Sequence, residues 1–281
     1  MPSYVVTLQC IDGPGIVLAA SSAVVKLRGN ILENDQFTDP VTNQFCMRTR
    51  FETEIDDVAA VESSLTQELN RFAPHLRVRP EAVHRSALIM VSRFDHCLAD
   101  LLYRRDQGDL VLDIAAIVSN HGDCAELARR HEVPYYEIAV SPSTRASAEA
   151  QLLALVDQYD VDFVVLARYM QVLSPDFVAR RPARIINIHH SFLPAFVGAK
   201  PYHQAKARGV KLIGATAHYV TRDLDQGPII EQDVCRVTHR DDVHELLRKG
   251  GELERRVLTT AVRLHLERRV LVSGNRTIVF G

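Results

Sequence analysis

The sequence predicts an α/β protein of two domains, a small ferredoxin-like α+β domain followed by a Rossmann-like, mostly parallel α/β domain. In the first stretch the order is strand, helix, strand, strand, helix, strand, and in the second stretch apolar strands alternate with amphipathic helices. A chain of 281 residues is long for one domain and sufficient for two. We expect the first domain to span residues 1–83 and the second residues 86–281.

Six short segments make up the first domain. The β-branched run 4–10 is a strand, and Gly13-Pro14-Gly15 ends it and opens a helix that continues to about Leu27. The remaining two strands, second helix and weak closing strand are expected at 31–38, 45–51, 56–72 and 76–83. Segment 77–85 is charged, contains Pro80 and lacks apolar periodicity, which predicts a linker there.

The second domain is predicted from the alternation of apolar strands with amphipathic helices. Its first strands are expected at 87–92, 113–119, 135–140 and 162–167, and the helices between them at 95–105, 124–131 and 144–159. This order indicates a parallel sheet with helices on both faces and ligands at the carboxyl ends of the strands. The pattern of segment 241–267 predicts one amphipathic helix, with Gly250-Gly251 as a candidate position for a jog in the helix axis.

The composition excludes several classes of protein. Acidic and basic side chains are interspersed and give a formal net charge of −2, whereas a general nucleic-acid binder needs a basic stripe. No apolar run reaches the length of a membrane span, and the first residues lack the pattern of a secretory signal. Five scattered cysteines without a Cys-x-x-Cys pair indicate a reduced compartment. We therefore expect a cytoplasmic protein without nucleic-acid or membrane partners.

The run Asn187-Ile-His-His-Ser-Phe-Leu-Pro194, followed by Asp225-Gln-Gly-Pro228, is the strongest functional signal. On the strand that Ile185-Ile186 predicts, Asn187 and His189 point to one face and His190 to the other. An amide can donate to a developing oxyanion, an imidazole can carry a proton, and a carboxylate can take a proton from water. Asn187, His189 and Asp225 are therefore the candidate catalytic residues.

These motifs resemble the folate-dependent formyltransferase family, whose catalytic residues are Asn, His and Asp. The longer string that runs from Asn187 to Ala205 is similar to the formyltetrahydrofolate deformylase branch. The resemblance implies a formyltransferase-type fold and hydrolysis of 10-formyltetrahydrofolate to formate and tetrahydrofolate, which supplies formate for purine synthesis and balances the one-carbon pool. It implies no prosthetic group. Two alternatives stay open: transfer of the formyl group to an amine, and a regulatory binding protein with an inactive catalytic domain.

The same resemblance assigns a folate pocket to two segments. The family binds the pterin between the loop that corresponds to 166–174 and the stretch before the catalytic Asp, here 221–225. The substrate-binding candidates that follow are Arg168, Tyr169, Met170, Leu173, Thr221 and Leu224. Arg168 has a plainer interpretation as a surface charge.

The turn 91–97 favours water over a phosphorylated acceptor. Related transferases carry a Gly-rich turn here that cradles phosphate at a helix N-terminus. This turn has no glycine, and Asp95 at the expected helix start would repel phosphate while capping the helix amides. Phe94 adds bulk, whereas Arg93 could still recruit an anion.

The start of the chain carries a second resemblance. Cys10-Ile-Asp-Gly-Pro-Gly-Ile16, with Gly29-Asn-Ile-Leu-Glu33 after the helix, is similar to the ACT ligand-binding domain. It implies an amino-acid effector and a homo-oligomer, dimer or tetramer. Gly13 stands where the deformylase branch has a basic or polar residue, and a dimerising module without a ligand is the alternative interpretation.

A metal site is the competing interpretation of the histidines. Five side chains would supply enough ligands on paper: His189, His190, His203, His218 and Asp225. The chain has no His-Glu-x-x-His motif and no cysteine pair, so we expect no metal. His218 alternates with apolar neighbours, and its simplest interpretation is a hydrogen-bonded core histidine.

Overall fold

The computed structural model describes residues 1–194 and 201–281. The part of the deformylase-like string that falls on 195–200 lies outside the described residues. Contacts divide the chain into two compact units, the first comprising Met1–His84, Glu267–Ser273 and Thr277–Gly281, and the second Arg85–Leu266 with Gly274–Arg276.

The first unit is built on a four-stranded sheet in the order β2-β3-β1-β4, in which every described pair of strands is antiparallel. Its elements follow the predicted order: β1 (Ser3–Ile11), α1 (Ile16–Lys26), β2 (Asn30–Asp39), β3 (Gln44–Glu52), α2 (Val58–Leu69), η1 (Asn70–Phe72) and β4 (His75–Pro80). Because β4 pairs with β1 as far as Pro80, the expected linker at 77–85 is too long, and only residues 81–84 lie between β4 and β5.

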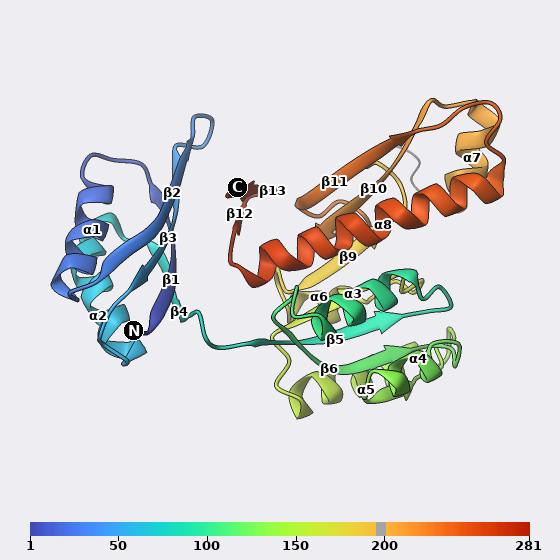
Figure 1. Ribbon diagram of the computed structural model, residues 1–281, viewed down its shortest axis with the longest axis horizontal. Coiled ribbons are helices and arrows are strands. Elements are labelled where there is room, and N and C mark those ends of the chain that lie inside the picture. The colour runs from blue at the N-terminus through green and yellow to red at the C-terminus, as the bar shows by residue number, and fades with distance from the viewer. Residues whose placement is uncertain (195–200) are drawn as a thin grey trace. The chain divides into compact units, whose positions relative to one another are not determined.

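One face of this sheet and the two helices enclose the core of the first unit. Figure 1 shows α1 and α2 on the same side of the sheet. Alternate residues of β1, such as Val6 and Leu8, point to the helices and meet Val24 of α1 and Leu65 of α2. Burial of this alternating set explains why the strand pattern was readable in the sequence.

The last residues of the chain form a hairpin of β12 (Val270–Ser273) and β13 (Arg276–Val279), which the sequence analysis did not predict. Leu271 and Phe280 pack on Cys46 of β3, and the Gln9 side chain donates to the Val272 carbonyl at 2.9 Å. The second domain was expected to run to residue 281, whereas most of 267–281 groups with the first unit. The reason is that a four-residue strand has little pattern of its own and takes its place from the surface it covers.

The second unit contains a seven-stranded sheet in the order β11-β10-β9-β8-β5-β6-β7. The strands are β5 (Arg85–Val91), β6 (Leu112–Ser119), β7 (Tyr135–Glu137), β8 (Phe163–Leu166), β9 (Ile185–His189), β10 (Leu212–Tyr219) and β11 (Ile229–Arg236). The helices are α3 (His96–Asp106), α4 (Ala125–Arg130), α5 (Arg145–Gln158), α6 (Pro175–Ala179), α7 (Pro201–Arg208) and α8 (Val243–Leu266). The strands from β7 to β9 are parallel, and β10 and β11 are antiparallel additions.

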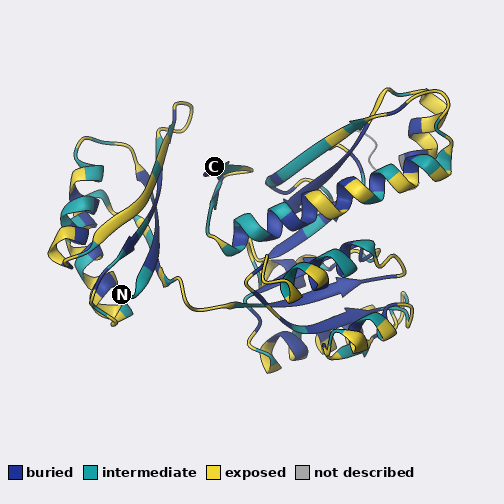
Figure 2. Ribbon diagram, viewed as in Figure 1, coloured by how far each residue is buried: buried dark blue, intermediate teal, exposed yellow. Residues whose placement is uncertain are grey.

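The centre of this sheet is buried on both faces, as expected for a parallel sheet between helices. Figure 2 shows β5 and β6 coloured mainly as buried, and β8 is buried along its whole length. Helix α8 packs against β9, β10 and β11 and runs without a jog at Gly250. A Cβ at Gly250 would stand 1.9 Å from the Tyr202 hydroxyl, so this glycine provides room for the Tyr202 ring and does not break the helix.

The parallel strands β8 and β9 lie side by side and end at the same edge of the sheet, with Leu166 opposite Asn187. The predicted functional segments follow these strand ends, which places them next to one another in space. None of the helices in the described ranges is long and apolar enough to cross a membrane.

Candidate active site

A cavity of about 470 Å³ opens at the carboxyl ends of β8 and β9. Its size falls within the usual range for small-molecule sites. The loop after β8, the end of β9 and the stretch between β10 and β11 contribute its walls. All nine predicted catalytic and substrate-binding residues line it: Asn187, His189, Asp225, Arg168, Tyr169, Met170, Leu173, Thr221 and Leu224.

Asn187 and His189 stand two residues apart on β9 and both face the cavity, which confirms the predicted geometry of the strand. The strand is fixed on both sides, because Asn187 lies opposite Leu166 of β8 and opposite His218 of β10. The His189 side chain is 7% exposed, and its Nε2 atom is buried without a hydrogen-bond partner. A buried ring nitrogen without a partner, at the edge of a cavity, is available to a ligand atom.

Asp225 completes the cluster from the loop after β10. Its backbone has φ 56°, and its Oδ2 atom lies 3.3 Å from His189 Nδ1. The loop returns tightly to the strand, since a Cβ at Gly227 would stand 1.7 Å from the Tyr219 carbonyl oxygen. Burial alone would raise the pKa of Asp225, but its contacts with His189 and His218 outweigh burial and hold the pKa well below the usual range. The carboxylate is therefore ionised near neutral pH.

His218 belongs to this cluster, although its sequence context suggested only a core position. Its Nδ1 atom lies 2.9 Å from the Tyr219 carbonyl, which can only accept, so Nδ1 carries a proton. In the neutral ring Nε2 is then an acceptor, and it faces Asn187 Nδ2 at 3.2 Å. This orients the amide with one N–H bond on His218 and the other free for a ligand. Asp225 Oδ1 is 3.7 Å from the same Nε2. The only indication in the sequence that His218 belongs to this cluster was its position seven residues before Asp225.

The expectation for His190 is wrong. It was expected on the opposite face of the strand, yet its ring centroid lies 5.2 Å from that of His189 and both rings line the cavity. Strand β9 ends at His189, so the alternation of faces does not extend to the next residue. Burial and the positive charge of Arg168 lower the pKa of His190 to about 4. A neutral ring therefore stands beside His189 at neutral pH.

Acidification should destabilise the protein through His190. Between pH 6.5 and 4 the unfolded chain binds a proton that the folded chain does not, so stability falls as the pH falls through this window. When the pH is lowered from 7 to 5, the free energy of unfolding of the wild type should fall by about 1–2 kcal/mol more than that of His190→Gln. Urea denaturation at both pH values measures this difference. Equal losses of unfolding free energy in the two proteins would contradict the assignment of His190 as a buried, neutral ring.

The loop after β8 forms the wall that the sequence analysis assigned to folate. The Ser92 hydroxyl accepts from the Met170 backbone N–H at 3.0 Å and donates to Asn120 at 2.7 Å, which ties the loop to the ends of β5 and β6. Tyr169 and Leu173 are buried in the core beneath the loop, whereas the Met170 side chain is 53% exposed. An exposed apolar side chain at a cavity is suited to a flat ring.

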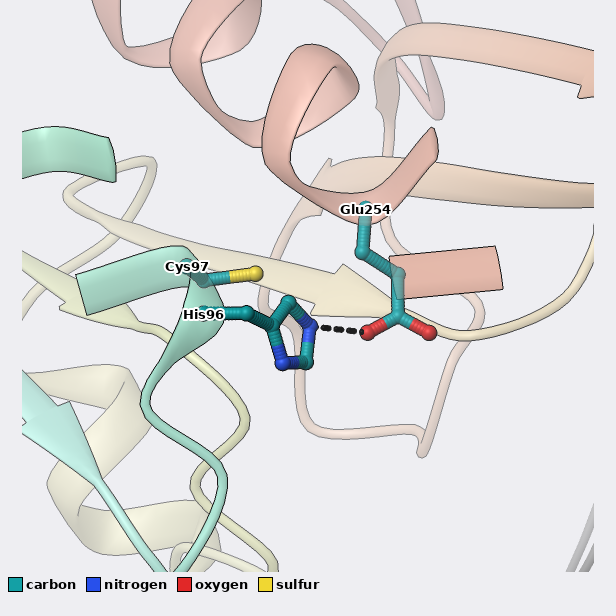
Figure 3. A group of neighbouring side chains, drawn as sticks. All are labelled: His96, Cys97 and Glu254. Carbon is teal, nitrogen blue, oxygen red and sulfur yellow. Dashed lines mark hydrogen bonds and ion pairs between the residues drawn. The ribbon is translucent and has the colours of Figure 1, made fainter. Parts of the chain in front are cut away.

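A second polar cluster, which the sequence did not predict, lies beside the cavity. Glu254 of α8 is 2% exposed, accepts from the Tyr202 hydroxyl at 2.7 Å and pairs with His96 Nε2 at 2.8 Å. Figure 3 shows His96 and Glu254 joined by this contact, with Cys97 next to them. Arg168 Nε lies 3.4 Å from the same carboxylate.

This cluster is the one group of metal-ligand type among the described residues. Its chemistry fits an ion-pair network better than a metal site, because Glu254 is already neutralised by Arg168. Burial holds the pKa of Cys97 well above its usual value, so the sulfur stays a thiol. The histidines of the competing metal interpretation do not form such a group in the described part of the chain.

Near the expected phosphate turn, the structure corrects one detail. Asp95 occupies the N-cap position of α3, but its side chain makes no capping hydrogen bond. It is exposed and leaves the amides of the first turn without the expected partner. The negative charge at the helix start is nevertheless present, and Phe94 is 51% exposed beside it.

The second unit is a mostly parallel α/β domain with an amide, an imidazole and a carboxylate around one cavity. This arrangement is typical of enzymes that transfer or hydrolyse an acyl group, and the comparisons with known proteins indicate the same class. Residues 85–262 match the family model described as "Formyl transferase". A formyltetrahydrofolate deformylase from Bacillus subtilis is 45% identical over 276 residues, 97% of this chain and 92% of that protein.

Solved structures support the same family. A crystal structure of a formyltetrahydrofolate deformylase from Pseudomonas syringae pv. tomato has a TM-score of 0.97 at 44% identity, covering all of this chain and 95% of that one. A glycinamide ribonucleotide transformylase 1 from Symbiobacterium toebii has a TM-score of 0.68 at 31% identity, with 72% of this chain and 97% of that one covered. The chain belongs to the formyltetrahydrofolate deformylase family.

Proposed function

We propose that this protein hydrolyses 10-formyltetrahydrofolate to formate and tetrahydrofolate. The single observation that carries the proposal is the convergence of Asn187, His189 and Asp225 on one cavity, with His189 Nδ1 3.3 Å from Asp225 Oδ2. The names of the relatives, which cover almost the whole chain, point to the same reaction.

In the proposed reaction, Asn187 Nδ2 and Nε2 of protonated His189 donate to the formyl oxygen. Asp225 takes a proton from the attacking water, whose oxygen bonds to the formyl carbon. The negative charge of the tetrahedral intermediate then lies on the former carbonyl oxygen, where the two donors stabilise it. Collapse breaks the bond between carbon and the folate nitrogen, which receives a proton from His189 directly or through water.

The cavity walls suit the larger part of the substrate. Met170 and Leu224 present exposed apolar side chains, at 53% and 60%, from opposite stretches of the lining. We assign the pterin to the space between these stretches, with backbone groups of the loop after β8 pairing with the ring edge. Arg168, Tyr169, Leu173 and Thr221 complete the proposed binding set.

The decisive experiment incubates purified protein with 10-formyltetrahydrofolate and no amine acceptor. We expect formate and tetrahydrofolate in equal amounts, measured by an enzymatic formate assay and by absorbance. Product formation only after a primary amine is added would instead establish the transferase alternative. Tight folate binding without any turnover would support the regulatory alternative.

We assign the first unit to the ACT group, with an amino-acid effector and a homo-oligomer, dimer or tetramer, as companion proposals. The support is the strand and helix order of the unit and the motif at 10–16. Light scattering tests the assembly, and the mass of a single chain would contradict it. Five free cysteines, four of them buried, are consistent with the proposed cytoplasmic location.

A further inference from the structure

Arg168 sits in an unfavourable position that hydrolysis by the three catalytic candidates does not explain. Its backbone has φ 66°, a region that favours glycine. Its side chain is 7% exposed, and its Nε and Nη1 atoms are buried without a hydrogen-bond partner. Strained and unsatisfied groups of this kind gather at functional sites.

The guanidinium of Arg168 connects the cavity to the turn after β5. Its Cζ atom lies 5.3 Å from the centre of the Phe94 ring, and the residue lines the cavity together with His189 and His190. Arg168 therefore extends from the loop after β8 to the turn after β5 and forms part of the cavity wall.

Glu254 fixes the guanidinium in this place. The carboxylate receives hydrogen bonds from Tyr202 and His96 and lies 3.4 Å from Arg168 Nε (Figure 3 shows the His96 contact). Burial would raise the pKa of Glu254, but His96 and the charge of Arg168 keep it below its usual value, so it stays ionised. The positive charge of Arg168 is thus neutralised, and its Nε and Nη1 atoms, which have no hydrogen-bond partner, are out of reach of solvent. Both facts argue against recruitment of an anionic acceptor.

We propose that Arg168, packed on Phe94 and paired with Glu254, is the specificity-determining residue that excludes amines and leaves water as the nucleophile. The inference rests on the hydrolysis proposed above. An amine that takes the formyl group must place its nitrogen at the formyl carbon and must also find room in the cavity for its substituents. Arg168 fills part of the wall that it shares with His189 and His190, whereas water has no substituents to place.

The test measures the partition between two products of one substrate. With 10-formyltetrahydrofolate labelled with ¹³C in the formyl group and glycinamide as the amine, NMR separates formate from N-formylglycinamide. Transfer forms the new carbon–nitrogen bond, breaks the bond between the formyl carbon and the folate nitrogen, and moves one proton from the amine to that nitrogen. The wild type should give formate with only a small, measurable share of N-formylglycinamide. Arg168→Gly, which suits the left-handed backbone, should raise the ratio of formamide to formate at least about tenfold.

A second variant and a control make the result specific. Arg168→Gly with Glu254→Gln removes both charges of the pair, so the buried carboxylate is not left unpaired, and it should show the same rise. Arg28→Gly makes the same exchange at an exposed arginine whose backbone has φ 51° and which is not part of the cavity lining, so it should leave the ratio unchanged.

An unchanged ratio in both Arg168 variants would overturn the inference. A folded variant that releases neither product would also overturn it, because Arg168 would then act in hydrolysis itself. Failure of the proposed function is distinguishable, since in that case the wild type releases no formate.

Discussion

Asp225→Asn should reduce the rate of formate release by about 100- to 10,000-fold, the usual contribution of a positioned general base. An asparagine cannot take a proton from water, and it places no charge near His189 Nδ1, 3.3 Å from the present carboxylate. The substitution keeps the size of the side chain and leaves the rest of the cavity lining intact. The kcat should therefore fall while tetrahydrofolate still binds, as measured by steady-state kinetics and isothermal titration calorimetry.

The matched control is Asp223→Asn, which removes an exposed carboxylate two residues earlier in the same loop. It should change kcat by no more than a few-fold, because the carboxylate beside His189 and His218 is that of Asp225. Near-normal turnover of the Asp225 variant would refute its role as the base. Loss of tetrahydrofolate binding would place Asp225 in substrate binding instead.

Asn187→Ala should lower kcat by about 100- to 1,000-fold, since one oxyanion donor contributes about 3 kcal/mol. KM should change little, because the hydrogen bond strengthens only as charge develops on the formyl oxygen. A large rise in KM with an unchanged kcat would contradict this, since it would mean that Asn187 binds the ground state.

A double-mutant cycle tests whether His218 acts through the amide. His218 Nε2 faces Asn187 Nδ2 at 3.2 Å, so the two substitutions should be coupled. We expect Asn187→Ala with His218→Ala to lose less activity than the two single variants predict by addition. Strict additivity would show that His218 does not orient the amide.

The local patterns of the sequence predicted much of the site. Asn187 and His189 share a face because a strand alternates with a period of two, and no distant contact is needed for that. Likewise, apolar strands alternating with amphipathic helices require a parallel sheet whose loops meet at one edge. The loop at 166–174 and the stretch at 221–225 therefore reach the same cavity, as predicted.

Other features depended on contacts between distant segments. The environment of His190 followed from the exact end of β9, which sheet pairing sets. The hydrogen bond of His218 to Asn187 required the antiparallel register of β9 and β10. The C-terminal hairpin has too few residues for a readable pattern, and its place follows from packing on Cys46 and from the Gln9 hydrogen bond.

By itself, the sequence determined the class of fold, the order of most elements and the three polar groups at the reaction centre, because short-range periodicity and motif spacing are properties of the chain alone. Only the tertiary structure decided what surrounds them. Glu254 lies on the last long helix, yet it holds Arg168 from the loop after β8 and His96 from the start of α3. Burial makes such a pairing strong, and burial is defined only once segments far apart in the sequence have packed together.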